Sequence, residues 1–67
     1  MIRYLIATDA GAYLRGFREW SADKRPVWTD DPTQALAFVL EQSAQSTRFS
    51  MLAPGVRAAT HVEEFVT

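Results

Sequence analysis

Residues 2–11, IRYLIATDAG, decide the fold, because they contain a strand and the turn that folds the chain back. Ile2–Thr8 is rich in aromatic and β-branched residues, which favour an extended backbone. Asp9-Ala10-Gly11 follows with the Asp and Gly that suit a tight turn. Apolar side chains occupy both faces of Ile2–Thr8, so we expect this strand to lie in the centre of a sheet.

The residues after the turn complete a predicted hairpin. Ala12–Arg18 resumes an extended pattern, and alternation divides its side chains between two faces. One face is predicted to carry Tyr13, Arg15 and Phe17, and the other Leu14, Gly16 and Arg18. The polar stretch Glu19–Pro26 is then expected to form an exposed loop.

Two tryptophans lie near the ends of this loop. Trp20 and Trp28 suit the open edge of a small core, which is where large aromatic side chains usually pack. Both also suit an exposed anchor for a partner, because Trp and Arg are over-represented among binding hot spots. The sequence favours the core but leaves both alternatives open.

Asp30-Asp31-Pro32-Thr33-Gln34 predicts the start of a helix. Asp31 suits the N-cap, Pro32 suits the first helical position, and Gln34 can reach back as in a capping box. Capping explains the two aspartates better than a metal site does.

The apolar residues beyond the cap predict a helix that covers the sheet. They recur at helical spacing and continue to Met51: Leu36, Val39, Leu40 and Ala44. Because residues 45–50 are Ser/Thr-rich, residues 32–53 are compatible with one helix, two helices, or a helix and a short strand at 48–52. Ala53-Pro54-Gly55 ends whatever precedes it.

The final segment, Ala58–Val66, has the composition of a last strand with Glu63 or Glu64 exposed. The predicted fold is therefore α+β, with a three-stranded antiparallel sheet (β-β-α-α-β) and helix packed on one face. Sixty-seven residues make one domain, 1–67. A chain this short buries only about 60% of its unfolded surface, which leaves little room for an enclosed active site.

The residue inventory argues against an enzyme. The chain has no cysteine, which excludes disulfides, thiolate nucleophiles and Cys-containing zinc sites. His61 is the one histidine, and no nucleophile elbow accompanies the serines that it would need. The three glycines are scattered and form no phosphate-binding loop. We therefore predict no catalytic, cofactor-binding or metal-binding residue.

Charge and hydropathy indicate where the protein acts. The net charge of −1 comes from interspersed acidic and basic residues, which disfavours a protein devoted to nucleic-acid backbones. No stretch has the pattern of a signal peptide or the roughly 20 apolar residues of a membrane span. We expect a cytoplasmic protein with no membrane partner.

The pattern of turn and core residues resembles that of short, uncharacterised phage and prophage proteins. It consists of the opening strand with Gly11, the segment Tyr13–Phe17, Trp28-Thr29-Asp30-Asp31, the helical Ala35, Phe38 and Ala44, and the acidic strand Val62–Phe65. The chain departs from that pattern at Val39-Leu40, where a Ser/Thr cap usually separates two helices, so a single fused helix is one alternative. The resemblance implies the scaffold above and an accessory protein that binds and inhibits, or redirects, a host protein.

One stretch combines basic and aromatic side chains, and we predict that it is the partner-binding surface. Its members are Arg15, Arg18, Trp20, Lys24, Arg25 and Trp28. The expected function is a small non-enzymatic protein-binding or inhibitory module that acts on an unidentified host protein. The alternatives are a nucleic-acid-binding protein that uses the same residues, which the mixed charge disfavours, and a self-associating structural or assembly component. A strand edge offers a further route to partner binding or a homodimer.

Overall fold

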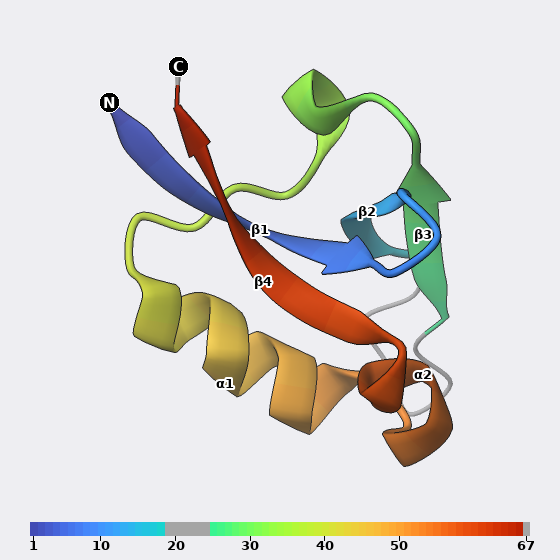
Figure 1. Ribbon diagram of the computed structural model, residues 1–67. Helices are drawn as coiled ribbons and strands as arrows, with labels where there is room; N and C mark the ends of the chain where they lie inside the picture. The colour runs from blue at the N-terminus through green and yellow to red at the C-terminus, as the bar shows by residue number, and fades with distance from the viewer. Residues whose placement is uncertain (19–24, 67) are drawn as a thin grey trace.

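The computed structural model describes residues 1–18 and 25–66, which form an α+β fold with a four-stranded antiparallel sheet (Figure 1). The strands are β1 (Ile2–Thr8), β2 (Tyr13–Phe17), β3 (Pro26–Thr29) and β4 (Thr60–Val66). The helices are the 3₁₀ turn η1 (Pro32–Gln34), α1 (Glu41–Met51) and α2 (Pro54–Ala58). The strand order is β3-β2-β1-β4, so β1 is central as predicted and both termini lie at one end of the sheet.

The β1–β2 turn forms as the sequence predicts. Gly11 has a φ of 95°, which glycine adopts without the steric penalty of a side chain. Its amide donates to the Thr8 carbonyl (3.0 Å), and the Thr8 amide donates to the Ala12 carbonyl (2.7 Å). On its other side, β1 pairs with β4 without interruption from Ile2↔Val66 to Thr8↔Thr60.

Pro26–Thr29 is a strand, so the prediction of a three-stranded sheet is wrong. It pairs with β2 at four positions, from Tyr13↔Thr29 to Phe17↔Pro26. The predicted loop therefore ends before Pro26, and residues 19–24 of that loop lie outside the described part of the chain. A four-residue strand that starts with proline is too short to show a period, and it forms because β2 supplies its partner.

The predicted N-cap at Asp31 is confirmed, but it caps a single 3₁₀ turn. Asp31 Oδ1 accepts hydrogen bonds from the Thr33 amide (3.0 Å) and the Thr33 hydroxyl (2.7 Å). These bonds lower the pKa of the Asp31 carboxyl, the hydroxyl contributing most. The predicted capping box would use the Gln34 side chain. The structure instead has the Gln34 backbone amide donating to the Asp31 carbonyl (3.0 Å).

The predicted helical stripe through Val39 and Leu40 is wrong, because residues 35–40 lie in no helix. The Leu36 amide donates to the Leu14 carbonyl (2.8 Å), and Tyr4 and Phe38 exchange two backbone hydrogen bonds of 2.9 Å. β1 pairs with β2 only near Ala7↔Tyr13, and at Tyr4 the same side of β1 pairs with Phe38 of this segment instead. Val39 and Leu40 are 66% and 60% exposed. Residues 32–53 thus come nearest to the two-helix alternative, with η1 and α1 separated by non-helical chain.

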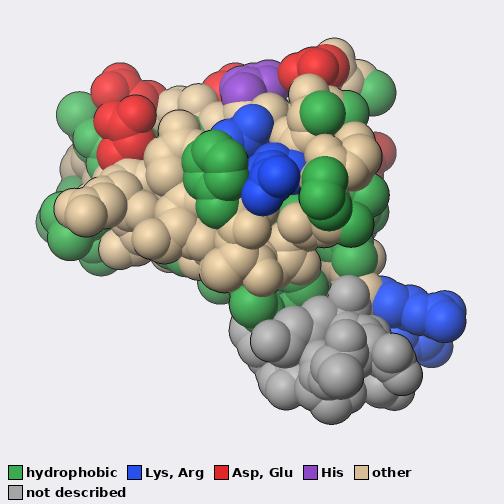
Figure 2. Space-filling model, turned by 90° about the horizontal axis from the view of Figure 1, so that it is seen from below, with side chains coloured by type: hydrophobic (Ala, Val, Ile, Leu, Met, Phe, Trp, Pro, Cys, Tyr) green, Lys and Arg blue, Asp and Glu red, His purple; other side chains and the backbone are tan. Residues whose placement is uncertain are grey.

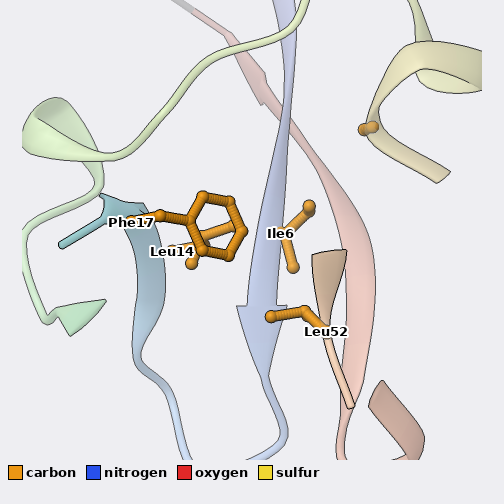
Figure 3. Packing of buried hydrophobic residues seen from close by; sticks show 5 residues of the cluster. Ile6, Leu14, Phe17 and Leu52 are labelled. Carbon is orange, nitrogen blue, oxygen red and sulfur yellow. The ribbon is translucent and has the colours of Figure 1, made fainter. Parts of the chain in front are cut away.

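The core lies between α1 and one face of the sheet (Figure 3). Its buried members come from β1, β2, α1 and the segment after α1: Ile6, Leu14, Phe17, Ala44 and Leu52. Leu5 and Ala7 alternate with Ile6 along β1 and are also buried, so β1 is covered on both faces. Burying a Leu, Ile or Phe side chain contributes about 1.5–3 kcal/mol, so this cluster supplies much of the stability of so small a domain.

Candidate protein-binding surface

A β-bulge at Arg15 shapes the surface of the β2–β3 hairpin. The register advances from Leu14↔Trp28 to Gly16↔Val27, so β2 uses two residues where β3 uses one. Because of the extra residue, side chains on either side of the bulge no longer follow a single alternation. Leu14 and Phe17 are therefore both buried, although strict alternation predicts that they lie on opposite faces. Arg15, the extra residue, is exposed. Bulges commonly redirect a side chain in this way near functional sites.

A shallow, open hollow of about 210 Å³ lies beside the bulge. It is lined by Arg15, Gly16, Phe17 and Val27. A Cβ atom added to Gly16 meets no heavy atom within 4 Å, so the missing side chain leaves the floor of the hollow unfilled. The hollow therefore has an apolar wall next to the Arg15 side chain. Binding sites commonly combine apolar walls with a few polar groups in this way.

Arg18 and Arg25 lie opposite each other, one residue after β2 and one residue before β3 of the same hairpin. The Arg18 amide donates to the Arg25 carbonyl (2.9 Å), which continues the register of Phe17↔Pro26. Strand alternation puts both side chains on the face that also carries Gly16 and Val27, and both are exposed. Within residues 1–18 and 25–66, neither arginine forms an ion pair with a carboxylate. Directly opposed like charges in a sheet are destabilising.

The structure thus brings three of the six predicted partner-binding residues to one hairpin surface, and we call Arg15, Arg18 and Arg25 the arginine face. Trp28 is half-buried and packs against the core cluster, which confirms the core alternative for that residue. Trp20 and Lys24 lie outside the described residues, so their assignments stay predictions. Figure 2 shows a group of basic side chains at one corner of the molecule, apart from the basic side chains near the centre of that view.

His61 joins the β1–β2 turn to β4. Its Nδ1 lies 3.1 Å from Asp9 Oδ1, and its Nε2 lies 3.3 Å from Glu63 Oε2. Both ring nitrogens thus contact carboxylates rather than a serine hydroxyl. The three side chains are substantially exposed, so these ion pairs add little stability. In the described part of the chain, no group of three acidic or histidine side chains has the geometry of a metal site.

A second basic cluster, centred on Arg48 of α1, was not predicted from the sequence. Its Nε donates to Thr60 Oγ1 (2.9 Å), and Nη2 donates to the carbonyls of Thr60 (2.9 Å) and Arg57 (3.1 Å). Arg48 and Arg57 also lie over the ring of Phe49, at 5.3 and 4.8 Å from its centroid. Arg48 thereby ties α1 to the end of α2 and the start of β4. Its partners Thr60 and Arg57 are 12 and 9 residues away, so no local pattern could have revealed these contacts.

Comparison with known proteins adds no family assignment. No protein-family model matches the chain, and no curated protein or solved structure is significantly similar to it. The predicted resemblance to phage and prophage proteins therefore stays a prediction. Among the described residues, no helix combines the length and apolar character needed to cross a membrane.

Proposed function

We propose that this protein is a small non-enzymatic binding module whose arginine face docks an acidic surface of a host protein. Accessory proteins of the phage and prophage kind, which bind and inhibit or redirect a larger protein, are the class that fits this proposal. The cytoplasm is the compartment we propose for it.

One observation carries the proposal: Arg18 and Arg25 are opposed across two strands and lack a carboxylate partner among the described residues. Like charges opposed in this way repel each other, and an anionic partner that covers them converts the repulsion into attraction. Arg15 and the hollow beside Gly16 extend the same surface with a cation and an apolar groove. Arginine and apolar grooves are common features of protein-binding hot spots.

Affinity capture from a host lysate tests the proposal. The tagged chain should retain a specific protein, and a variant with Arg15→Glu, Arg18→Glu and Arg25→Glu should not. Arg3→Glu is the matched control, because Arg3 lies on β1 and its side chain bonds only the neighbouring Ile2 carbonyl among the described contacts. Capture by the triple variant at the wild-type level would refute the assignment of this surface.

Filling the hollow is an independent test that changes no charge. A Gly16→Val side chain extends into open space, and Gly16 has no positive φ, so the fold should tolerate the change. Gly55→Val is the control, because a Cβ on Gly55 of α2 also meets nothing within 4 Å. We expect the Gly16 variant to bind the captured protein more weakly and the Gly55 variant to bind it normally.

The nucleic-acid alternative uses the same arginines and is tested by offering nucleic acid to the protein directly. Binding to a nucleic-acid backbone falls steeply with salt because counterions are released at each phosphate contact. A gel-shift or anisotropy titration with single-stranded and duplex DNA and RNA at 50 and 200 mM salt distinguishes the two. A steeply salt-dependent shift would favour the alternative, and no shift at low salt would exclude it.

A further inference from the structure

The two edges of the sheet differ in how well they are protected against further strand pairing. The β3 edge is four residues long, starts with Pro26 and borders a bulge, all of which discourage another strand. The β4 edge is seven residues long, contains no proline and pairs with β1 without a bulge. A long, regular edge of this kind is a template for an added strand.

Backbone hydrogen bonds establish which groups of β4 point outward. Tyr4 and Thr8 direct their amides to Phe38 and Ala12, on the β2 side of β1. Their partners in β4, Glu64 and Thr60, therefore form the non-hydrogen-bonded pairs of the β1–β4 ladder. Glu64 and, by alternation, Val62 and Val66 direct their N–H and C=O groups away from β1. No hydrogen bond to these outward groups occurs within the described part of the chain.

The outward edge has a defined beginning and a defined charge. The free edge begins after Thr60, because the Thr60 carbonyl already accepts a hydrogen bond from Arg48 Nη2. Beyond Thr60 it carries Glu63 and Glu64, both exposed, on opposite faces of the strand. At its far end Val66 is 72% exposed and lies opposite Ile2, which is 47% exposed.

A second copy of the chain fits this edge poorly. In a symmetric dimer, the β4 strands of two copies would pair antiparallel around a two-fold axis. If the axis passes through the middle of β4, Glu63 lies opposite Glu63 or Glu64 lies opposite Glu64. The register centred on Val62 needs the Thr60 carbonyl, which Arg48 occupies. Directly opposed like charges destabilise a strand pair, so a chain of the opposite charge fits these central registers better than a second copy does.

We propose that the free edge of β4 binds an extended segment of a partner protein that carries two adjacent basic residues between apolar residues. In an antiparallel arrangement the two basic side chains lie opposite Glu63 and Glu64, one on each face of the sheet. The flanking apolar side chains lie opposite Val62 and Val66, and the backbone forms up to about four ladder hydrogen bonds with Val62 and Glu64. This surface is separate from the arginine face.

The test uses fluorescence anisotropy with the full-length chain and a labelled, capped peptide, Thr-Val-Thr-Lys-Lys-Val-Thr. Its matched control replaces Lys-Lys with Glu-Glu and should bind roughly tenfold more weakly or not at all. A third peptide with N-methyl groups at alternate positions keeps the charge but loses ladder donors, and it should also fail. Failure of the Lys-Lys peptide, or equal binding of the control peptides, would overturn the proposal.

Glu64→Pro tests the edge from the side of the protein. The Glu64 amide points outward, so proline removes a donor to the partner while every β1–β4 hydrogen bond stays intact. We expect a folded variant that has lost peptide binding, whereas Phe65→Pro, which removes an inward donor, should unfold the sheet. Glu64→Lys keeps the backbone donor and should bind the Glu-Glu peptide better than the wild type does.

Two further results would contradict the proposal. The first is a folded Glu64→Pro variant that binds the Lys-Lys peptide as the wild type does. The second is a concentration-dependent dimer of the wild type, measured by sedimentation, that Glu64→Pro abolishes, because a second copy would then be the occupant. The charge reversals on the arginine face should leave peptide binding unchanged, which separates this proposal from the proposed function.

Discussion

Replacing Arg48 with Met should remove a large share of the stability of this domain. The substitution keeps the apolar stem of the side chain and deletes a guanidinium that bonds Thr60 Oγ1, the Thr60 and Arg57 carbonyls and Gln45 Oε1. Thr60 is only 4% exposed, so its polar atoms are poorly placed to find water instead. The Thr60 hydroxyl keeps its own bond to the Arg57 carbonyl (2.8 Å).

The expected loss follows from these contacts. A hydrogen bond that involves a charged group contributes about 1.5–3 kcal/mol when it is not replaced by water. Because Arg48 is half-buried, water recovers part of the four bonds, and we expect a loss of about 2–3 kcal/mol. Domains of this size have a total stability of about 3–10 kcal/mol. Arg48→Met should therefore remove at least about a fifth of the stability, and nearly all of it if the total lies at the lower end of this range.

Urea unfolding, followed by tryptophan fluorescence and far-ultraviolet circular dichroism, measures this loss. With an m-value of about 1 kcal/mol/M for so small a chain, the midpoint should fall by about 2–3 M. Arg3→Met is the matched control, because within residues 1–18 and 25–66 the Arg3 side chain bonds only the adjacent Ile2 carbonyl (3.2 Å). This substitution should shift the midpoint by less than about 0.5 M. Equal midpoints for the two variants would refute the role of Arg48.

Three other substitutions test the fold. Gly11→Ala should destabilise the protein by about 1 kcal/mol or more, because Gly11 has a φ of 95°. Gly16→Ala, whose added Cβ meets only open space, should leave the urea midpoint nearly unchanged. Equal shifts of the midpoint for the two variants would contradict this expectation. The Asp31 pKa is lowered, so its contribution to stability is present above the ordinary carboxyl pKa and is lost as the pH falls through the lowered value. Asp31→Asn should flatten that part of the stability–pH curve measured by thermal unfolding, and an unchanged curve would argue against the cap. Ile6→Ala should cost about 2–5 kcal/mol and largely unfold the chain, as judged by the loss of backbone amide protection in hydrogen exchange.

The elements that the sequence predicts correctly are those with strong local signals. Ile2–Thr8, the turn at Gly11 and the Asp31 cap each depend on residues close together in the chain, and the structure confirms all three. The central position of β1 also followed from apolar residues on both of its faces.

The errors arose where tertiary contacts override local pattern. Val39 and Leu40 have helical spacing, yet Phe38 pairs with Tyr4 and holds the preceding chain extended. Strict alternation misplaced Phe17, because a bulge at Arg15 becomes visible only once β3 is known to be the partner.

The candidate surface was predicted in part. Arg15, Arg18 and Arg25 were chosen for their composition, and the structure adds that Arg18 and Arg25 are opposed across two strands. Trp28 belongs to the rim of the core. The unequal protection of the two sheet edges could not be predicted, since it depends on the strand order and on which β4 amides point outward.

The most direct test of the arginine face is the binding of Arg18→Glu to the protein captured by the wild type. This substitution converts an opposed like-charge pair into an attractive one with Arg25, so it should raise the free energy of unfolding by about 0.5–1 kcal/mol. We predict a variant that is more stable than the wild type and has lost at least about tenfold in affinity. A folded Arg18→Glu variant that binds the captured protein with wild-type affinity would contradict the account.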